Sequence, residues 1–414
     1  MRVAVFHNLP GGGARRVVQQ HCRGLRARGH EVVVYEPETA DSTTWDICEV
    51  ADRVVRVQLE WREPLLTGSR LTRPFRALAN LQRLRGNYRR LGDMGRSVAA
   101  QIDAADHDVL YVHHDLFETA PSVLVNAQTP SVYFCQEPCR AMFEAPVHEA
   151  PGRTPAPLPK ALWRQALAPR PFVAFRILNE RANTLAADRV LANSAYSIES
   201  ILRAHGRVAQ WCRLGVDTEF FSPGGEQKGE FVLSVGGFDV RKGYRFLVRA
   251  LGEVPAEQRP ELVLVGGPRT PQEVEELDGF AAARGVRIRP VERPSDDELR
   301  ALYGSARVFV YAPYLEPLGL APLEAMACGT PVLGVAEGGV RETVIRGATG
   351  RLVRRDEREF ARVLGEMLSD EAALEELGRR AREHVLREWT WDLSVEHLLS
   401  HFEEVLAERA ARTA

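Results

Sequence analysis

Long apolar runs and an excess of charge are both missing from this chain. No hydrophobic stretch approaches the roughly 18 residues that cross a bilayer. The N-terminus predicts a strand, with neither the apolar region nor the cleavage site of a signal peptide. A formal net charge of −2 argues against bulk nucleic-acid binding. We therefore expect a cytoplasmic protein without a nucleic-acid partner.

Cysteines are few, and their spacing is not that of a metal site. Six are present, and no second Cys or His pair completes a zinc site beside Cys135 and Cys139. Free thiols in a reducing compartment are the simplest interpretation. The glycine-rich turn of the first half also lacks the Gly-x-Gly-x-x-Gly fingerprint, followed about 20 residues later by an acid, that dinucleotide-binding folds carry.

The length and the pattern of the chain predict two α/β domains. At 414 residues it exceeds the size at which a single core keeps growing. Short β-branched runs alternate with amphipathic stretches, which is typical of parallel sheets covered by helices. The expected domains are 1–215 and 216–390, with a final helix over 391–414. The expected strands are 2–7, 31–35, 108–112, 130–135, 189–192, 231–235, 261–265, 286–289, 307–310 and 332–335.

The segment from Glu316 to Val332 contains the most informative pattern. A helix is predicted to begin near Leu320, because Pro322 sits in a first turn whose N–H would be unpaired anyway. Gly329 is expected to end this helix. Free backbone amides at such a helix start form an anion site. The two flanking acids, Glu316 and Glu324, would repel a phosphate unless they face neutral hydroxyl donors, as a sugar nucleotide provides.

This spacing of two acids, with Gly-Leu, Ala-Met-Ala and Gly-Thr-Pro between and after them, resembles the signature of the family 4 retaining glycosyltransferases. The resemblance implies the GT-B fold, in which two Rossmann-like doubly wound domains face a cleft and a C-terminal helix crosses back to the N-terminal domain. It also implies that Glu316 binds hydroxyls of the transferred sugar and Glu324 binds the ribose. The donor is further expected to contact Leu318, Gly319 and Leu320.

A strand, a glycine turn and a helix follow one another from Phe231 to Gly243. Lysine at that helix mouth is a suitable point charge for a diphosphate leaving group. In the resembled family this loop carries an arginine and a lysine on the phosphates. Lys242 matches the lysine, whereas Gly237 stands at the arginine position. Arg241 is the candidate to supply the second charge.

Three segments of the first half are expected at the same cleft. The glycines of the first turn, Gly12 and Gly13, let a ligand approach the backbone. His113 ends a strand and matches the family position whose histidine contacts the transferred sugar. The His-His-Asp run that begins at His113 has two other interpretations, a metal ligand set or a structural loop. Glu137 and Arg140 follow another strand and are acceptor candidates.

Two basic segments break the alternation of the first half. Residues 61–100 hold nine arginines against two acids, and residues 151–181 hold six basic residues against one acid. Leucine and phenylalanine recur every three to four positions in the first segment. Such a helix can lie on an anionic membrane surface, or it can be a core-facing helix with a solvated side.

The sequence as a whole predicts transfer of a sugar from a UDP- or GDP-sugar to a hydroxyl acceptor, with His113, Lys242 and Glu316 as the catalytic residues. No cofactor is expected, and a role for Mg²⁺ is left open because no Asp-x-Asp motif is evident. Two rivals remain. One is a retaining glycosidase that uses the two glutamates across one glycosidic bond, and the other is a non-catalytic scaffold of the same fold at a membrane surface. For the enzyme itself, peripheral attachment to the inner face of the plasma membrane is left open.

Overall fold

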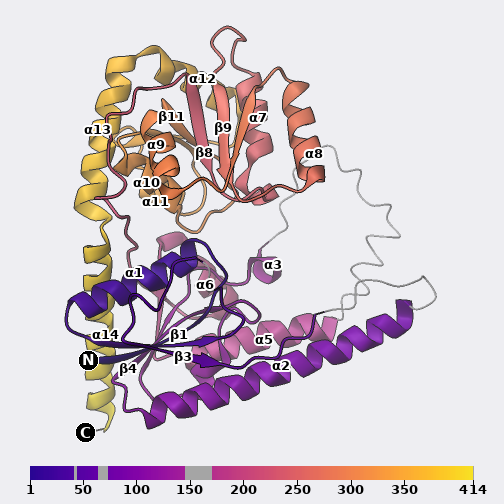
Figure 1. Cartoon of the computed structure of the whole chain (residues 1–414), viewed down its shortest axis with the longest axis vertical. Coiled ribbons are helices and arrows are strands. Elements are labelled where there is room, and N and C mark those ends of the chain that lie inside the picture. Colours follow the sequence, from indigo (N-terminus) through magenta and orange to yellow (C-terminus); the bar gives the residue numbers. More distant parts are fainter. Residues whose placement is uncertain (42–43, 64–72, 145–169, 414) are drawn as a thin grey trace.

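The structure is a computed structural model that describes residues 1–41, 44–63, 73–144 and 170–413. It contains a seven-stranded sheet in the order β3-β2-β1-β4-β5-β6-β7 and a six-stranded sheet in the order β10-β9-β8-β11-β12-β13. All strand pairs within the two sheets are parallel. Figure 1 shows the two lobes one above the other, each with helices packed around its sheet. The predicted α/β fold with two doubly wound domains is confirmed.

The bounds of the elements follow the chain. The N-terminal lobe contains β1 Arg2–Asn8, α1 Gly13–Ala27, β2 Glu31–Pro37, β3 Arg53–Val57, α2 Arg73–Ala104, β4 Val109–Asp115, η2 Ser122–Val125, β5 Ser131–Phe134, α3 Arg140–Phe143, α5 Arg170–Ala186, β6 Arg189–Ala192, α6 Ala195–His205 and β7 Gln210–Trp211. The C-terminal lobe contains β8 Phe231–Val235, η3 Val240–Lys242, α7 Tyr244–Gly252, β9 Glu261–Gly266, α8 Pro271–Ala282, β10 Ile288–Glu292, α9 Asp296–Ser305, β11 Val308–Tyr311, α10 Leu320–Ala327, β12 Val332–Val335, α11 Val340–Thr343, β13 Gly350–Val353 and α12 Glu357–Ser369. Two helices, α13 Glu371–Glu388 and α14 Trp391–Thr413, complete the chain.

The final helix returns to the N-terminal lobe, as predicted. α14 packs on α1 and β5, and Figure 1 shows it running down beside the lower lobe. A buried hydrogen-bond chain fixes it there: His21 of α1 contacts the Tyr111 hydroxyl through Nδ1 and the Ser394 Oγ through Nε2, both at 2.8 Å. Since both ring nitrogens are engaged, the imidazole joins β4, α1 and α14.

The two connections between the lobes lie against each other. The Val216 N–H donates to the Trp389 carbonyl at 2.8 Å. A Cβ at Gly215 would lie 2.4 Å from the Trp391 nitrogen, so only glycine allows this approach. The lobes are thus connected by two chain crossings at one place, which is where the hinge of a two-lobed protein lies.

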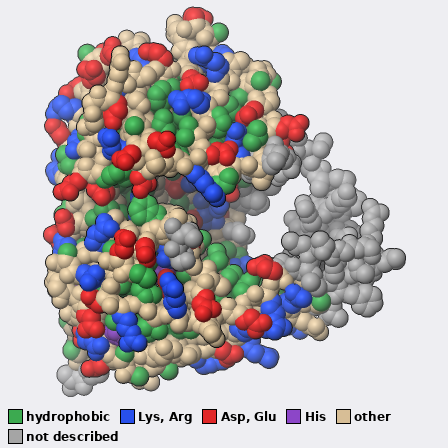
Figure 2. Space-filling model, in the orientation of Figure 1, with side chains coloured by type: hydrophobic (Ala, Val, Ile, Leu, Met, Phe, Trp, Pro, Cys, Tyr) green, Lys and Arg blue, Asp and Glu red, His purple; other side chains and the backbone are tan. Residues whose placement is uncertain are grey.

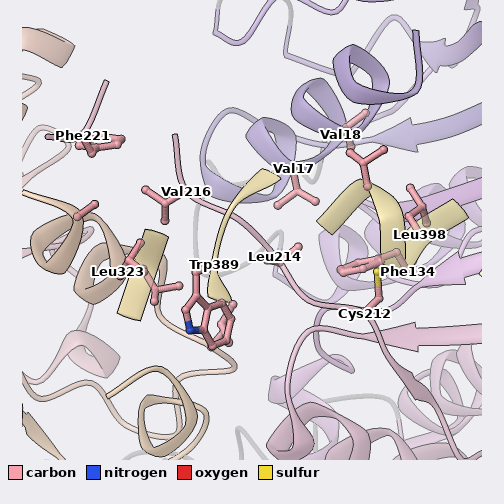
Figure 3. Close-up of a cluster of buried hydrophobic side chains, with 14 of the residues drawn as sticks. Val17, Val18, Phe134, Cys212, Leu214, Val216, Phe221, Leu323, Trp389 and Leu398 are labelled. Atoms are coloured by element: carbon pink, nitrogen blue, oxygen red, sulfur yellow. The ribbon is translucent and has the colours of Figure 1, made fainter. Parts of the chain in front are cut away.

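One apolar core continues through this hinge. Figure 3 shows Phe221 and Leu323 of the upper lobe, Leu214 between the lobes, and Val17 and Leu398 of the lower lobe in one buried cluster. Because the core does not stop at the boundary, the lobes are joined by buried apolar surface as well as by the chain itself.

The first basic segment forms most of α2, a long helix that lies beside α5 at the edge of the lower lobe (Figure 1). Tyr88 of α2 contacts the Phe172 and Phe175 rings of α5 edge-on. Of the second basic segment, residues 170–181 lie in α5. Residues 151–169 lie outside the described part of the chain. No helix of the described residues is long and apolar enough to cross a membrane.

Candidate donor site between the lobes

Two helix starts face each other where the lobes meet. α1 begins after Gly12 and α10 begins after Gly319, and neither start has a side-chain cap. Both glycines have positive φ, 125° and 92°. A Cβ at Gly13 would lie 3.7 Å from the Leu320 side chain, so the two starts are in contact range across the boundary. Their first-turn amides and positive dipole ends therefore face one region that favours an anion.

The predicted helix boundaries in the signature segment are confirmed. α10 begins at Leu320 and ends at Ala327, and Gly329 follows with φ 75°. Leu318 is buried in the core, so only its backbone is available to a ligand.

Lys242 and Glu316 form an ion pair beside these helix starts. Their Nζ and Oε2 atoms are 2.9 Å apart, and the side chains are 28% and 17% exposed. The two residues follow β8 and β11, which are neighbours in the sheet, so their loops leave the same edge. Gly243 has φ 70°, and a Cβ there would lie 2.0 Å from the Ala312 carbonyl oxygen. The glycine thus lets the loop of Lys242 press against the loop of Glu316.

The glycines of the loop after β12 pack against the backbone of the Glu316 loop. A Cβ at Gly338 would lie 2.3 Å from the Glu316 carbonyl oxygen, and one at Gly339 would lie 2.1 Å from the Pro317 carbonyl oxygen. The Gly339 N–H also donates to the Glu316 carbonyl at 2.8 Å. Leu315 has φ 49°, which is strained for this residue type. The glycine pair therefore packs against the loop of residues 315–319, the signature loop, and keeps it in this conformation.

Glu324 is engaged on both oxygens. The Tyr303 hydroxyl donates to Oε2 at 2.7 Å. Arg16, on the first turn of α1, donates to Oε1 across the lobe boundary. Only 4% of Glu324 is exposed. Sequence reasoning did not identify Arg16 or Tyr303, since neither lies in a motif with Glu324; the one available signal was the position of Arg16 just after Gly12-Gly13.

Arg241 is close to the pair but is held by a different acid. Its Nε and Nη2 lie 3.0 and 3.3 Å from the two oxygens of Asp239. At Gly237 the backbone does not need positive φ, and a Cβ would meet no atom within 4 Å. The family arginine is therefore absent from a position that has room for one. The role of Arg241 on the phosphates stays a prediction.

His113 lies deeper than expected. The sequence predicted that it faces the cleft, but its ring is fully buried against Tyr111 and Phe134. On its other side the ring lies 6.4 Å from that of His21 in α1, and its place at the cleft stays a prediction. Burial lowers its pKa well below the usual value, with His21 adding to the effect, so the ring is neutral. Both ring nitrogens lack a partner among the described residues, and its catalytic role stays a prediction.

The acceptor candidates lie next to the signature loop. Arg140 Nη2 donates to the Tyr314 carbonyl at 2.7 Å, which links the lobes two residues before Glu316. Glu137 Oε2 is 3.6 Å from Arg140 Nε and is buried without a hydrogen-bond partner among described residues. Burial, with a contribution from Glu316, raises the pKa of Glu137 to about 7. A carboxyl group of this kind exchanges a proton near neutral pH.

A further contact across the boundary involves the start of α6. The Ala195 and Tyr196 N–H groups donate to the two oxygens of Glu342 at 2.7 and 3.0 Å. Ser194 Oγ donates to the Pro317 carbonyl at 2.5 Å. The Glu342 carboxylate of the C-terminal lobe thus pairs with the start of α6 in the N-terminal lobe. The signature loop is contacted both by Ser194 and by the glycines that follow β12.

The site lies in a hollow between the lobes. Figure 2 shows the surface hollowed between the lobes, with basic side chains inside. In the described ranges, no group of three or more His, Cys, Asp and Glu residues is arranged to hold a metal ion. The expectation that no cofactor is required stays a prediction.

Known proteins share both the sequence and the fold of the chain. A family model for glycosyl transferase 4-like domains matches residues 12–215, and one for glycosyl transferases group 1 matches 216–384. A D-inositol 3-phosphate glycosyltransferase of Acidothermus cellulolyticus is 33% identical over 58% of this chain and 58% of its own length. An α-maltose-1-phosphate synthase of Mycobacterium tuberculosis is 30% identical over 55% of this chain and 66% of its own. These alignments span less than two thirds of either relative.

Solved structures match nearly the full length. A sucrose-phosphate synthase of Thermosynechococcus elongatus has a TM-score of 0.72 at 21% identity, covering 99% of this chain and 100% of its own. Anabaena HepE, solved with UDP and glucose, has a TM-score of 0.71 at 17% identity over 98% and 100%. Likeness at these identities shows the GT-B fold. Together with the two adjoining family models, it establishes that the chain belongs to the group 1 family of glycosyl transferases with a GT4-like N-terminal domain.

Proposed function

We propose that this chain is a retaining glycosyltransferase that moves a sugar from a UDP- or GDP-sugar to a hydroxyl acceptor. The observation that carries the proposal is the meeting of two uncapped helix starts, α1 and α10, beside the Lys242–Glu316 pair. A diphosphate bound there would face oriented amides and one mobile cation. The binding of UDP by HepE, a protein of the same fold, gives additional support.

The reaction that fits this arrangement is a front-face displacement. The bond between the sugar C1 and the diphosphate oxygen breaks, the acceptor oxygen forms a bond to C1 on the same face, and the acceptor proton goes to the leaving phosphate. Lys242 and the helix starts stabilise the negative charge that grows on the diphosphate. Glu316 is within reach of sugar hydroxyls once Lys242 turns to the phosphate. No separate general base is needed.

A panel of nucleotides tests the donor. Thermal unfolding is measured with UDP, GDP and ADP, and a ligand at 100 times its dissociation constant is expected to add about 2.7 kcal/mol to stability. Product configuration by NMR then tests retention. Equal, negligible shifts with all three nucleotides would contradict the proposal. Hydrolysis of an aryl glycoside without nucleotide would instead favour the glycosidase, which leaves Lys242 and the two helix starts unexplained.

Glu324→Gln tests the ribose assignment. Ribose contacts persist from ground state to transition state, so their loss acts as a loss of uniform binding. The donor KM is expected to rise about 10- to 100-fold, the scale of one or two hydrogen bonds to a charged group, while kcat changes little. Unchanged KM with a collapsed kcat would reject the assignment.

Membrane attachment of the N-terminal lobe is a separate proposal. On α5, Phe175 and Leu178 are 46% and 65% exposed, and the neighbouring α2 exposes Arg85 and Arg89. Apolar side chains beside arginines suit an anionic lipid surface, at about 1 kcal/mol per engaged arginine. The same basic segment also contains Arg73 and Arg76, whose side chains lie outside the described part.

Liposome co-sedimentation tests this attachment. Binding is expected to rise with the fraction of anionic lipid and to fall with salt, and Arg85→Gln/Arg89→Gln and Leu178→Glu are each expected to weaken it. Arg23→Gln, on the exposed side of α1, is the control for loss of charge. Equal binding to neutral and anionic vesicles would reject the electrostatic version.

A further inference from the structure

Arg16 joins the two lobes at Glu324, the residue assigned to the ribose in the proposed function. It lies on the first turn of α1, three residues after Gly13, and its Nη2 bonds the Glu324 carboxylate of α10. Its side chain is only 13% exposed, and its Nε is buried without a hydrogen-bond partner in the described residues. A buried guanidinium with a donor to spare is able to take a further acceptor.

Two aromatic rings lie beside the Arg16 side chain. The ring of Trp45 lies 5.4 Å and that of Phe221 6.0 Å from its guanidinium carbon. Trp45 has φ 53°, a strained backbone for a bulky residue. The buried Arg15 holds Thr44, the residue before Trp45, because its Nε donates to the Thr44 carbonyl at 2.9 Å. Both rings lie within cation–π distance of the guanidinium.

Ribose hydroxyls and Arg16 compete for one carboxylate. Oε2 of Glu324 is bonded by Tyr303, Oε1 is bonded by Arg16, and the residue is 4% exposed. A ribose therefore reaches Glu324 only when one of these two donors leaves it. Tyr303 is fully buried, whereas the Arg16 side chain is 13% exposed, so Arg16 is the one to move. The released guanidinium then lies beside the facing starts of α1 and α10, where a diphosphate would bring two negative charges.

Two further described cations lie in this part of the site. Lys242, bonded to Glu316, is already assigned to the diphosphate, whereas Arg241 is bonded to Asp239 and is 48% exposed. Gly237 offers no side chain at all. We propose that Arg16 is a two-position donor residue: the nucleoside displaces it from Glu324, and it then binds the diphosphate in place of the arginine that Gly237 lacks. This inference depends on the proposed function, because it assumes that a nucleoside diphosphate binds here.

The proposal predicts opposite effects of one substitution on two ligands. In Arg16→Gln the nucleoside no longer has to displace a cation, so uridine is expected to bind about 3- to 10-fold more tightly. UDP loses a charge-assisted contact and is expected to bind about 10-fold more weakly, the scale of one such hydrogen bond. An arginine that only holds the lobes together would change both affinities in the same direction.

Calorimetric titration of the full chain with uridine and UDP, and in parallel with guanosine and GDP, measures this. Arg23→Gln, on the same helix, is expected to match wild type. Arg16→Gln/Gly237→Arg is expected to recover UDP affinity while uridine remains tight, because Gly237 has room for a side chain and needs no positive φ. Equal factors for both ligands, or no rescue by Gly237→Arg, would overturn the inference.

If Arg16→Gln does not fold, Glu324→Gln provides a second test. It removes the ribose acceptor and frees Arg16, so the ratio of the uridine to the UDP dissociation constant is expected to rise, whereas it falls in Arg16→Gln. An unchanged ratio would contradict the switch. Wild-type protein that binds neither UDP nor GDP would contradict the proposed function itself, and the two failures are therefore distinguishable.

Discussion

Lys242→Ala is expected to lower kcat by about 10²- to 10³-fold, the scale of one electrostatic donor to a developing charge. The leaving diphosphate carries most charge in the transition state, so the donor KM should change much less. Only three lysines, 160, 228 and 242, occur among the 54 Lys and Arg residues. Lys228 is bonded to the Gly304 and Ala306 carbonyls and to Thr330, away from this site. Steady-state kinetics with the nucleotide sugar identified by the binding panel is the measurement.

Lys242 also neutralises the partly buried Glu316, and a double substitution separates the two roles. If the lysine acts on the diphosphate, Lys242→Ala/Glu316→Gln should be clearly more impaired than Glu316→Gln alone. If it only pairs with the glutamate, the double variant should be no more impaired than Glu316→Gln, because the lysine has no further role once the carboxylate is gone. Near-normal turnover of Lys242→Ala would remove the residue from the site. Lys242→Arg tests whether a point charge is required, since a planar guanidinium is no equivalent.

Gly339→Ala is expected to reduce both stability and activity. The added Cβ would lie 2.1 Å from the Pro317 carbonyl oxygen and 2.8 Å from Leu318 Cα, which are backbone atoms that yield only if the signature loop moves. Forced displacement of well-packed atoms costs about 1–3 kcal/mol. Because that loop carries Glu316, kcat should fall together with the free energy of unfolding. Denaturant unfolding and turnover of the same preparation measure both.

Gly365→Ala is the matched control for that substitution. Gly365 lies within α12, and a Cβ there would meet no atom within 4 Å. Alanine in a helix interior is favoured over glycine by about 1 kcal/mol, so this variant should gain stability and retain activity. Full activity and stability in Gly339→Ala would show that the loop tolerates a shift, contrary to the packing argument.

The sequence by itself determined the elements that local chemistry encodes. Pro322 and Gly329 set the ends of α10 within a residue or two of the observed ones. The buried central strands β1, β4, β8 and β11 were predicted, because strands covered on both faces are nearly continuous apolar runs. The amphipathic pattern predicted the final helix itself. The resemblance to the glycosyltransferase family implied that this helix crosses back and that Lys242, Glu316 and the glycines of the first turn belong to one site.

Three strands were not predicted, and their sequences explain why. β3 is an edge strand that contains two arginines, β7 has two exposed residues, and β13 begins with a glycine. Each lacks the apolar run on which strand prediction depends. Such segments become strands because a neighbouring strand offers unpaired backbone groups, which is a property of the folded sheet.

Only the tertiary structure decided which charges meet. The Arg16–Glu324 and Tyr303–Glu324 contacts join residues 308 and 21 positions apart, and the Glu342 carboxylate binds the start of α6 in the other lobe. His113 was expected at the cleft because it ends a strand, and the fold buries its ring beside His21 of α1 and Phe134 of β5. Local pattern predicts that a residue follows a strand or starts a helix. The partner of its side chain depends on how two lobes pack, and no spacing along the chain encodes that.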